Sequence, residues 1–216
     1  MIFNYNPIMV INMLYIKAGK RLLDIILATL FIAIILPYIY ILIAIAVKLD
    51  SRGRILFTQE RTGLGGGKFR LMKFRTLFEG DHTLNRKGQY REVVPGDHNI
   101  TKVGIFLRKT GLDELPQMIN IIAGQMSLVG PRPYPTAMDR EMSENILNYF
   151  ERYRVKPGLT GWAQVNGLRG PATNPAVMRH RIKYDIWYMR HQSFGLDLLI
   201  IALGVKQFIC HLLIRK

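Results

Sequence analysis

Two adjacent carboxylates, Asp113 and Glu114, are the residues of this sequence best suited to carry chemistry. They stand at the start of a predicted helix, where the positive end of the helix dipole favours the ionised form of each carboxyl. An ionised carboxylate can act as a nucleophile, as a Mg²⁺ ligand or as a base. Neighbouring residues of a helix point about 100° apart, so the two side chains could take different roles. The same pair could also serve only as a helix cap, and the spacing leaves that alternative open.

Three arginines belong to the same hypothesis. Arg75 ends a basic predicted strand, Arg108 precedes the acidic pair, and Arg132 is fixed between Pro131 and Pro133. The planar guanidinium group of arginine suits two-point binding of phosphate oxygens. Mg²⁺ and an arginine cluster would together neutralise the charge at a phosphorus atom during a diphosphate transfer. Each arginine could equally be a solvated surface residue, because spacing alone does not show that these groups converge.

Composition narrows the class of protein. The chain has 216 residues, and 30 Lys and Arg against 15 Asp and Glu give a net charge of +15. This imbalance favours anionic partners such as phosphates, nucleic acid or acidic lipid. The single cysteine, Cys210, excludes an intramolecular disulfide and argues against a cysteine-based zinc site. The 49% share of hydrophobic residues excludes a disordered basic tail.

The segment 25–47 is apolar and carries no charge. As a helix it would reach roughly 35 Å, enough to cross a hydrocarbon core of about 30 Å. Pro37 lies near its middle and predicts a kink. Three basic residues flank the apolar segment on each side. They are Lys17, Lys20 and Arg21 before it, and Lys48, Arg52 and Arg54 after it. Because Lys and Arg favour the cytoplasmic side, this symmetry suits a re-entrant hairpin, whereas length alone favours a simple span. A cleaved signal peptide fits poorly, because the run is too long and no small-residue cleavage site follows it.

The rest of the chain reads as a small sheet with several helices. Strands are predicted over 54–59 and 68–77, joined by the glycine turn 63–67. Helices are predicted over 101–110, from Asp113 to Gly124, and over 139–153. A further amphipathic pattern places Met178, Ile182, Ile186 and Met189 on one face, and the tail 196–214 predicts an interfacial or docked helix. A polar loop is expected over 80–99.

The glycine-rich turn does not fit a nucleotide-binding loop. Thr62 stands where a Walker motif begins with glycine, and Phe69 follows Lys68 where Ser or Thr is needed. Lys68 also occupies the third glycine position of the dinucleotide fingerprint. A hairpin turn is therefore the better interpretation. Neither a serine-hydrolase elbow nor an RNA-recognition motif is present.

Seven segments together resemble the bacterial sugar transferase family, the monotopic polyprenol-phosphate phosphoglycosyl transferases. They are KRLLDI (20–25), FTQERTG (57–63), KFRTL (73–77), LDELPQMIN (112–120), SLVGPRP (127–133), VKPGLTGWAQVNG (155–167) and YDIWYMRHQSFGLDL (184–198). They follow the family's order over nearly the whole chain from about Lys17. The LRG that follows VNG is closer to the undecaprenyl-phosphate glucose or galactose phosphotransferases that act in exopolysaccharide synthesis.

The resemblance implies a two-step reaction with a UDP-sugar donor, Mg²⁺ and an undecaprenyl phosphate acceptor. Asp113 would attack the sugar-bearing phosphate, release UMP and contact Mg²⁺. The lipid phosphate would then take the phosphosugar, with Glu114 as proton acceptor or metal helper. The matching phosphate-binding residues are Arg75, Arg108 and Arg132, with Pro131 and Pro133 beside the last. This reaction would initiate exopolysaccharide, O-antigen or glycoconjugate synthesis.

The family also implies an architecture. We expect an α+β, mainly helical fold with a re-entrant membrane helix broken at Pro37, a small sheet, and amphipathic helices around a cytoplasmic active site. The expected divisions are an extension (1–16), the membrane helix (17–50), the catalytic domain (51–195) and an interfacial helix (196–216). The implied location is the bacterial inner membrane, facing the cytoplasm, with membrane lipid but no nucleic acid as partner. A homodimer stays open.

Two other classes compete with the enzyme. One is a membrane-tethered module that binds nucleic acid or anionic lipid through its charge, with salt-sensitive binding and no UMP release. The other is a scaffold with a degenerate active site. Whether the basic side chains gather around Asp113 and Glu114 or spread over a face distinguishes an enzyme from a charged binding surface.

Overall fold

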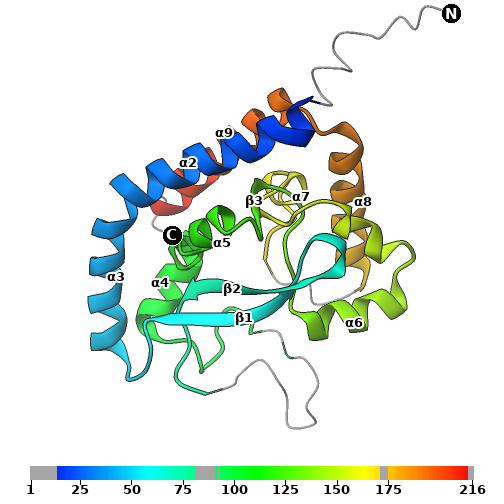
Figure 1. Cartoon of the computed structure of the whole chain (residues 1–216). Coiled ribbons are helices and arrows are strands. Elements are labelled where there is room, and N and C mark those ends of the chain that lie inside the picture. The colour runs from blue at the N-terminus through cyan, green and yellow to red at the C-terminus, as the bar shows by residue number, and fades with distance from the viewer. Residues whose placement is uncertain (1–13, 81–90, 92, 171–174, 214–216) are drawn as a thin grey trace, which may run out of the picture.

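The computed structural model describes residues 14–80, 91, 93–170 and 175–213. Within them the fold is mainly helical with two small two-stranded sheets, which confirms the predicted class. In Figure 1 long apolar helices frame the top and left of the molecule, and the strands lie beneath them. Most of the predicted extension 1–16, and much of the loop 80–99, lie outside the described residues.

The long apolar segment forms a bent pair of helices. A π-helical turn (Tyr15–Gly19) leads into α2 (Lys20–Ile34), and α3 (Leu36–Asp50) follows. The two helices are bent by 58° at the break. Pro37, in the first turn of α3, has no N–H to donate to the carbonyl one turn earlier, so the helix breaks here. The predicted kink is confirmed, and the pair has the length and composition of a broken span or a re-entrant loop.

The predicted hairpin is present and starts two residues later than expected. Strands β1 (Leu56–Thr62) and β2 (Lys68–Phe74) pair antiparallel, with Leu56 opposite Phe74. A 3₁₀ turn, η2 (Leu64–Gly66), connects them, and Gly65 and Gly66 both have positive φ. Residues with side chains rarely adopt that conformation, which explains the glycine run. The turn therefore has a structural reason independent of any nucleotide.

A second, parallel sheet joins two short strands from distant parts of the chain. Strand β3 (Ser127–Val129) pairs with β4 (Gly158–Thr160). Asp24 of α2 accepts hydrogen bonds from the Ser127 hydroxyl at 3.0 Å and from the Leu128 N–H at 2.8 Å. Helix α2 is thus tied to this sheet through a buried carboxylate.

The helix predicted over 139–153 is broken in the structure. Helix α6 (Thr136–Asn145) ends early, and a 3₁₀ helix, η4 (Tyr149–Arg154), follows. Asn148, between them, adopts a left-handed conformation with φ of 61°, which a continuous helix does not allow. The expected apolar residues still share one buried cluster: Met142, Ile146, Tyr149 and Tyr153, together with Met178 and Ile182. The predicted burial of these side chains is confirmed, but the prediction of one continuous helix over 139–153 is wrong.

Two helices complete the fold after the short α7 (Trp162–Val165). They are α8 (Pro175–His191) and α9 (Phe194–Leu213). Helix α9 is long and apolar enough to cross a membrane by length and composition. It runs beside α2 in Figure 1, and Ala28 and Ile200 of these helices share the central core. Helix α9 is thus packed on the core at Ile200, and its interfacial position stays a prediction.

A buried polar cluster joins the start of α2 to α8 and α9. Lys20 Nζ lies 2.5 Å from Oδ2 of Asp197 and 3.0 Å from the Tyr188 hydroxyl. Tyr188 donates to the other oxygen of Asp197 at 2.6 Å, and Tyr15 donates to Oδ2 at 2.5 Å. Asp197, which interrupts the apolar tail in sequence, is therefore a buried anchor.

Candidate active site

The acidic pair lies in a tight turn between two helices. Helix α4 (Lys102–Thr110) begins after Thr101, whose hydroxyl accepts the Gly104 N–H, and ends at Gly111 with φ of 79°. A 3₁₀ turn, η3 (Leu112–Glu114), carries the pair, and α5 (Gln117–Ile122) follows. The single helix predicted from Asp113 to Gly124 is therefore split, and its α-helical part begins only after Pro116.

Both oxygens of Glu114 are bound by basic side chains. Arg132 donates to Oε1 at 2.6 Å and to Oε2 at 3.2 Å, and Lys73 Nζ donates to Oε1 at 2.7 Å. Burial alone would raise the pKa of Glu114, but Arg132 and Lys73 hold it well below its usual range. Glu114 is therefore a firmly ionised anchor for two cations and a weak proton acceptor.

Asp113 has different surroundings. Its side chain is buried, and its closest cation is Lys73, whose Nζ lies 3.6 Å from Oδ2. Burial raises the pKa of Asp113 above its usual value, and Lys73, Arg108 and Arg132 offset this only in part. The expectation that the helix end would favour ionisation of both carboxyls is thus wrong for Asp113, because loss of hydration outweighs the nearby positive charges. Two neighbouring carboxyls with opposite pKa shifts are typical of catalytic pairs with divided roles.

The loop 130–135 holds Arg132 rigidly. Gly158 N–H donates to the Pro131 carbonyl at 2.9 Å, and Arg152 donates to the Arg132 carbonyl at 2.6 Å. Arg61 donates to the Pro133 carbonyl at 3.2 Å. Both prolines are buried and fix the backbone on either side of the arginine. In this structure Pro131 and Pro133 support Arg132, and direct substrate contact by them stays a prediction.

Arg108 lies close enough to the acidic pair to lower the pKa of Asp113. Its Nε donates to the Thr76 hydroxyl at 2.9 Å, and its Nη1 donates to the Val93 carbonyl at 3.1 Å. Arg108 is therefore held at the end of α4 by the segment that follows β2.

The hydrogen bonds of Arg75 lie outside the acidic pair. Its guanidinium donates to the Ser51 hydroxyl and carbonyl at 2.6 and 2.9 Å and to the Arg54 carbonyl at 2.5 Å, which closes the turn between α3 and β1. The structure does not group Arg75 with the carboxylates, and its phosphate role stays a prediction.

One basic residue of the site lies outside the predicted set. Lys73, on β2, contacts both carboxylates, although the sequence marks it only as part of a basic strand. No sequence signal separates Lys73 from Arg75, because both are basic residues of the same predicted strand.

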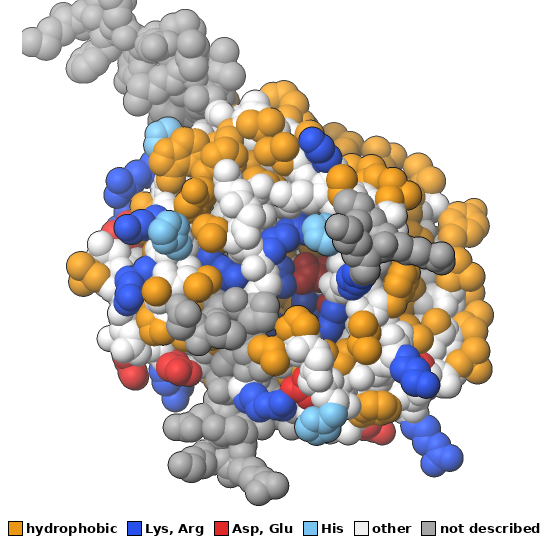
Figure 2. Space-filling view, turned by 180° about the vertical axis from the view of Figure 1, so that it is seen from behind, with side chains coloured by type: hydrophobic (Ala, Val, Ile, Leu, Met, Phe, Trp, Pro, Cys, Tyr) orange, Lys and Arg blue, Asp and Glu red, His pale blue; other side chains and the backbone are white. Residues whose placement is uncertain are grey.

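Figure 2 shows a hollow in which an acidic side chain is surrounded by Lys and Arg side chains. Lys73, Arg108 and Arg132 all act on Asp113. Basic residues thus gather at the acidic pair, which favours an active site over a uniformly charged binding face. Among the described residues, no group of three or more His, Cys, Asp or Glu side chains could enclose a metal ion.

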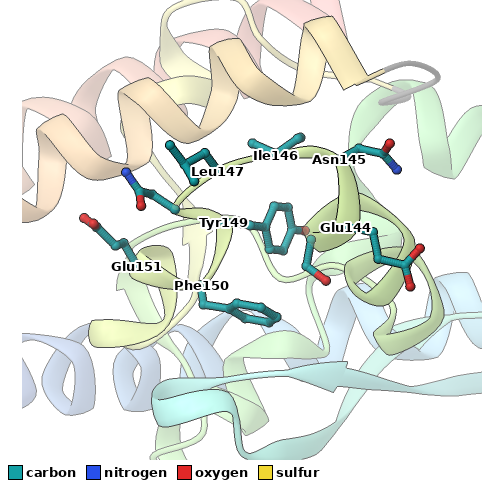
Figure 3. A pocket seen from close by; sticks show the side chains of 9 residues that line it. Glu144, Asn145, Ile146, Leu147, Tyr149, Phe150 and Glu151 are labelled. Atoms are coloured by element: carbon teal, nitrogen blue, oxygen red, sulfur yellow. The ribbon is translucent and has the colours of Figure 1, made fainter.

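Another hollow, of about 560 Å³, lies away from this pair. Residues 143–151 of the α6–η4 connection line it, and Figure 3 shows Tyr149 among them. None of the predicted catalytic or binding residues lines this hollow. We therefore keep the acidic pair as the candidate active site.

Comparison with known proteins identifies the family. Residues 15–211 match the model of the family described as "Bacterial sugar transferase". The chain belongs to this family. The matched residues include the acidic pair and all three predicted arginines. This match confirms the resemblance to the bacterial sugar transferase family seen in the motifs.

Similar curated proteins carry related names. An Escherichia coli K12 protein, "UDP-glucose:undecaprenyl-phosphate glucose-1-phosphate transferase", is 43% identical over 188 residues, covering 86% of this chain and 39% of that protein. A Caulobacter vibrioides protein of the same name is 44% identical, covering 88% of this chain and 69% of that protein. An Aeromonas hydrophila protein, "UDP-N-acetylgalactosamine-undecaprenyl-phosphate N-acetylgalactosaminephosphotransferase", is 36% identical, with 87% and 43% covered. The chain thus spans about two fifths of the first and third relatives.

Proposed function

We propose that this chain is a phosphoglycosyl transferase that moves a sugar-1-phosphate from a UDP-sugar to undecaprenyl phosphate and releases UMP. The observation that carries the proposal is the contrast between Asp113 and Glu114. The carboxylate of Asp113 is buried and has one ion pair, with Lys73 at 3.6 Å, whereas that of Glu114 is bound on both oxygens. Family membership and the names of the relatives support the same reaction class.

In the first step, a carboxylate oxygen of Asp113 attacks the sugar-bearing phosphorus. The bond from that phosphorus to the bridging oxygen breaks, and UMP leaves with the electron pair. Burial leaves the Asp113 carboxylate poorly solvated, which makes it a better nucleophile than an exposed aspartate. Arg132 and Lys73 are placed to bind the diphosphate oxygens, and Glu114 orients both cations.

In the second step, an oxygen of undecaprenyl phosphate attacks the phosphorus bound to Asp113. The bond between phosphorus and the Asp113 oxygen breaks, which regenerates the carboxylate and yields a lipid diphosphate sugar. The lipid phosphate is itself anionic, so this step needs no strong base. The lowered pKa of Glu114 therefore favours an orienting role over the proton-acceptor role.

The site offers Mg²⁺ one protein carboxylate. Glu114 is occupied by Arg132 and Lys73, which leaves the carboxylate of Asp113 as the available protein ligand. Mg²⁺ is commonly bound by one or two carboxylates together with substrate phosphates and water. Asp113 would thus hold an ion brought largely by the diphosphate. When bound, Mg²⁺ would neutralise charge on the transferred and leaving phosphates.

We further propose that α2 and α3 form a re-entrant hairpin in the inner membrane, with the active site on the cytoplasmic side. The 58° bend supports this arrangement, as do the basic residues that flank both ends. The large apolar side chains exposed on these helices include Leu22, Leu30, Tyr38, Leu42 and Leu49. Figure 2 shows hydrophobic side chains gathered along its top and right edge. Residues 17–50 would then be the membrane element, 51–195 the catalytic domain and 196–216 an interfacial helix.

The test of the reaction is UMP release by protein purified in detergent, with Mg²⁺, undecaprenyl phosphate and a panel of UDP-sugars that begins with UDP-glucose. We expect lipid-dependent UMP release with at least one donor. Asp113→Asn should abolish turnover and the phosphosugar adduct seen by mass spectrometry of the denatured protein. Glu60→Gln, which changes an exposed carboxylate on β1, is the matched control. Full turnover in Asp113→Asn would remove the nucleophile assignment, and no release from any donor would overturn the function.

The topology has its own test. In a Cys210→Ser background, Leu14→Cys and Arg52→Cys place single thiols at exposed positions before α2 and after α3. Membrane-impermeant thiol labelling of intact and opened cells should find both thiols on the cytoplasmic side. Labelling of one thiol in intact cells would establish a simple span instead.

A further inference from the structure

Arg152 is a buried arginine that bridges a carboxylate and the backbone of the Arg132 loop. It lies in η4 and is 2% exposed. Its Nη2 donates to the Arg132 carbonyl at 2.6 Å and to Oδ2 of Asp185 at 2.9 Å. Its Nε donates to the same oxygen of Asp185 at 3.2 Å. One guanidinium thus connects α8 to the loop that carries Arg132.

Aromatic rings surround this guanidinium. Its Cζ lies 4.5 Å from the ring centroid of Tyr134, 5.6 Å from that of Tyr149 and 5.8 Å from that of Tyr153. The rings limit the positions that Arg152 can take. Asp185 is also buried, so the pair is an ion pair largely removed from water. Such pairs add little net stability compared with apolar residues, and their best-supported benefit is a defined geometry.

The geometry that Arg152 defines is that of the active site. Its hydrogen bond holds the Arg132 carbonyl, and the Arg132 side chain binds both oxygens of Glu114. We propose that the Arg152–Asp185 pair is a positioning element that sets the direction of Arg132 for binding of the donor diphosphate. Arg152 and Asp185 act through Arg132 and do not touch the reacting atoms. The inference rests on the proposed function for the identity of the donor.

The pair should affect donor recognition more than the chemical step. In Arg152→Lys the charge opposite Asp185 is kept, but one ammonium cannot reproduce the planar fork that reaches both acceptors. Asp185→Asn keeps the shape and removes the charge that orients the fork. Misplacement of a binding group by about 1 Å can reduce efficiency about a hundredfold. For both variants we expect at least a tenfold rise in KM for the UDP-sugar, with kcat changed less than threefold.

A double-mutant cycle with Arg132→Ala tests whether the pair acts through Arg132. UDP affinity by titration calorimetry and kcat/KM from UMP release are measured for wild type, Arg152→Lys, Arg132→Ala and the double variant. The effect of Arg152→Lys should disappear in the Arg132→Ala background. Ser143→Ala is the matched control, because its hydroxyl donates to the Arg140 carbonyl at 2.8 Å on the exposed surface and not to Arg152, Asp185 or Arg132. That control should keep the wild-type KM, and thermal unfolding verifies that each variant is folded.

The possible outcomes separate the positioning role of the Arg152–Asp185 pair from the proposed enzymatic function. Additive effects in the cycle, or an unchanged KM in both Arg152→Lys and Asp185→Asn, would overturn the positioning role and leave the enzyme activity standing. UDP binding with coupled effects but no turnover with any donor would support the positioning role and overturn the proposed function. If Arg152→Lys does not fold, the same cycle is run with Asp185→Asn. Failure of wild type to bind UDP would overturn both.

Discussion

Removal of Lys73 should move the pH dependence of the first half-reaction. Lys73 is the closest cation to Asp113, and a positive charge stabilises the ionised carboxylate. At the 3.6 Å separation, Coulomb's law with an effective dielectric constant of about 20 gives an attraction of roughly 4.6 kcal/mol between the two charges. This energy corresponds to a shift of about three units in the pKa of Asp113. Arg108, Arg132 and water that enters the vacated space will compensate for much of this. We therefore expect Lys73→Met to raise the pKa of Asp113 by about one unit or more.

The sign follows from which form of Asp113 reacts. Only the ionised carboxylate attacks phosphorus, so activity falls as pH decreases through the pKa of Asp113. Burial already raises this pKa in the wild type, and loss of Lys73 raises it further. The acidic limb of the pH profile should therefore move to higher pH.

The assay is rapid-quench measurement of the first UMP burst, without lipid acceptor, between about pH 5 and 9. Omission of the acceptor keeps titration of the lipid phosphate out of the profile. Lys68→Met is the control, because Lys68 lies on the same strand and pairs with Glu60 at 2.9 Å on the exposed surface. An acidic limb at the same pH in Lys73→Met and wild type would refute the idea that Lys73 sets the ionisation of Asp113.

Three further predictions concern charge, packing and metal. Because the pKa of Asp113 is raised in the fold, its ionisation costs stability as pH rises through that pKa. Asp113→Asn should therefore unfold at a higher temperature than wild type at pH 7 and at nearly the same temperature near pH 3. Gly104→Ala would place a Cβ 2.1 Å from the Thr76 carbonyl oxygen and should cost about 3 kcal/mol, seen as a lower Tm, whereas Gly195→Ala, with open space, should not. Chelation by EDTA should stop UMP release and excess Mg²⁺ should restore it; full activity in EDTA would exclude a required divalent ion.

Local sequence patterns predicted much of the fold. The glycine run specified the hairpin turn, the residue spacing over 101–110 predicted α4, and Pro37 marked the bend. Each of these features depends on the conformational preferences of a few consecutive residues. The broken helix after Asn145 was missed because the left-handed conformation of Asn148 preserves the apolar face that a continuous helix would also present.

The candidate site was predicted less completely. Asp113, Glu114 and Arg132 come together as the sequence suggested, whereas Arg75 closes a turn and Lys73 takes a place beside the carboxylates. Lys73 and Arg75 are close in sequence and have similar charge, so only the tertiary packing decides which one reaches the acidic pair. The opposite pKa shifts of the two carboxyls also depend on burial, which spacing does not reveal.

The contacts of α2 have a consequence for the order in which the molecule is made. Lys20 and Asp24 leave the ribosome before their partners Asp197 and Ser127, which follow 177 and 103 residues later. Helix α2 is therefore made while two of its charges still lack their partners. Contacts between such distant segments form only after the intervening chain has been ordered. Final seating of α2 is thus a late step in folding, because it waits for α9 to emerge.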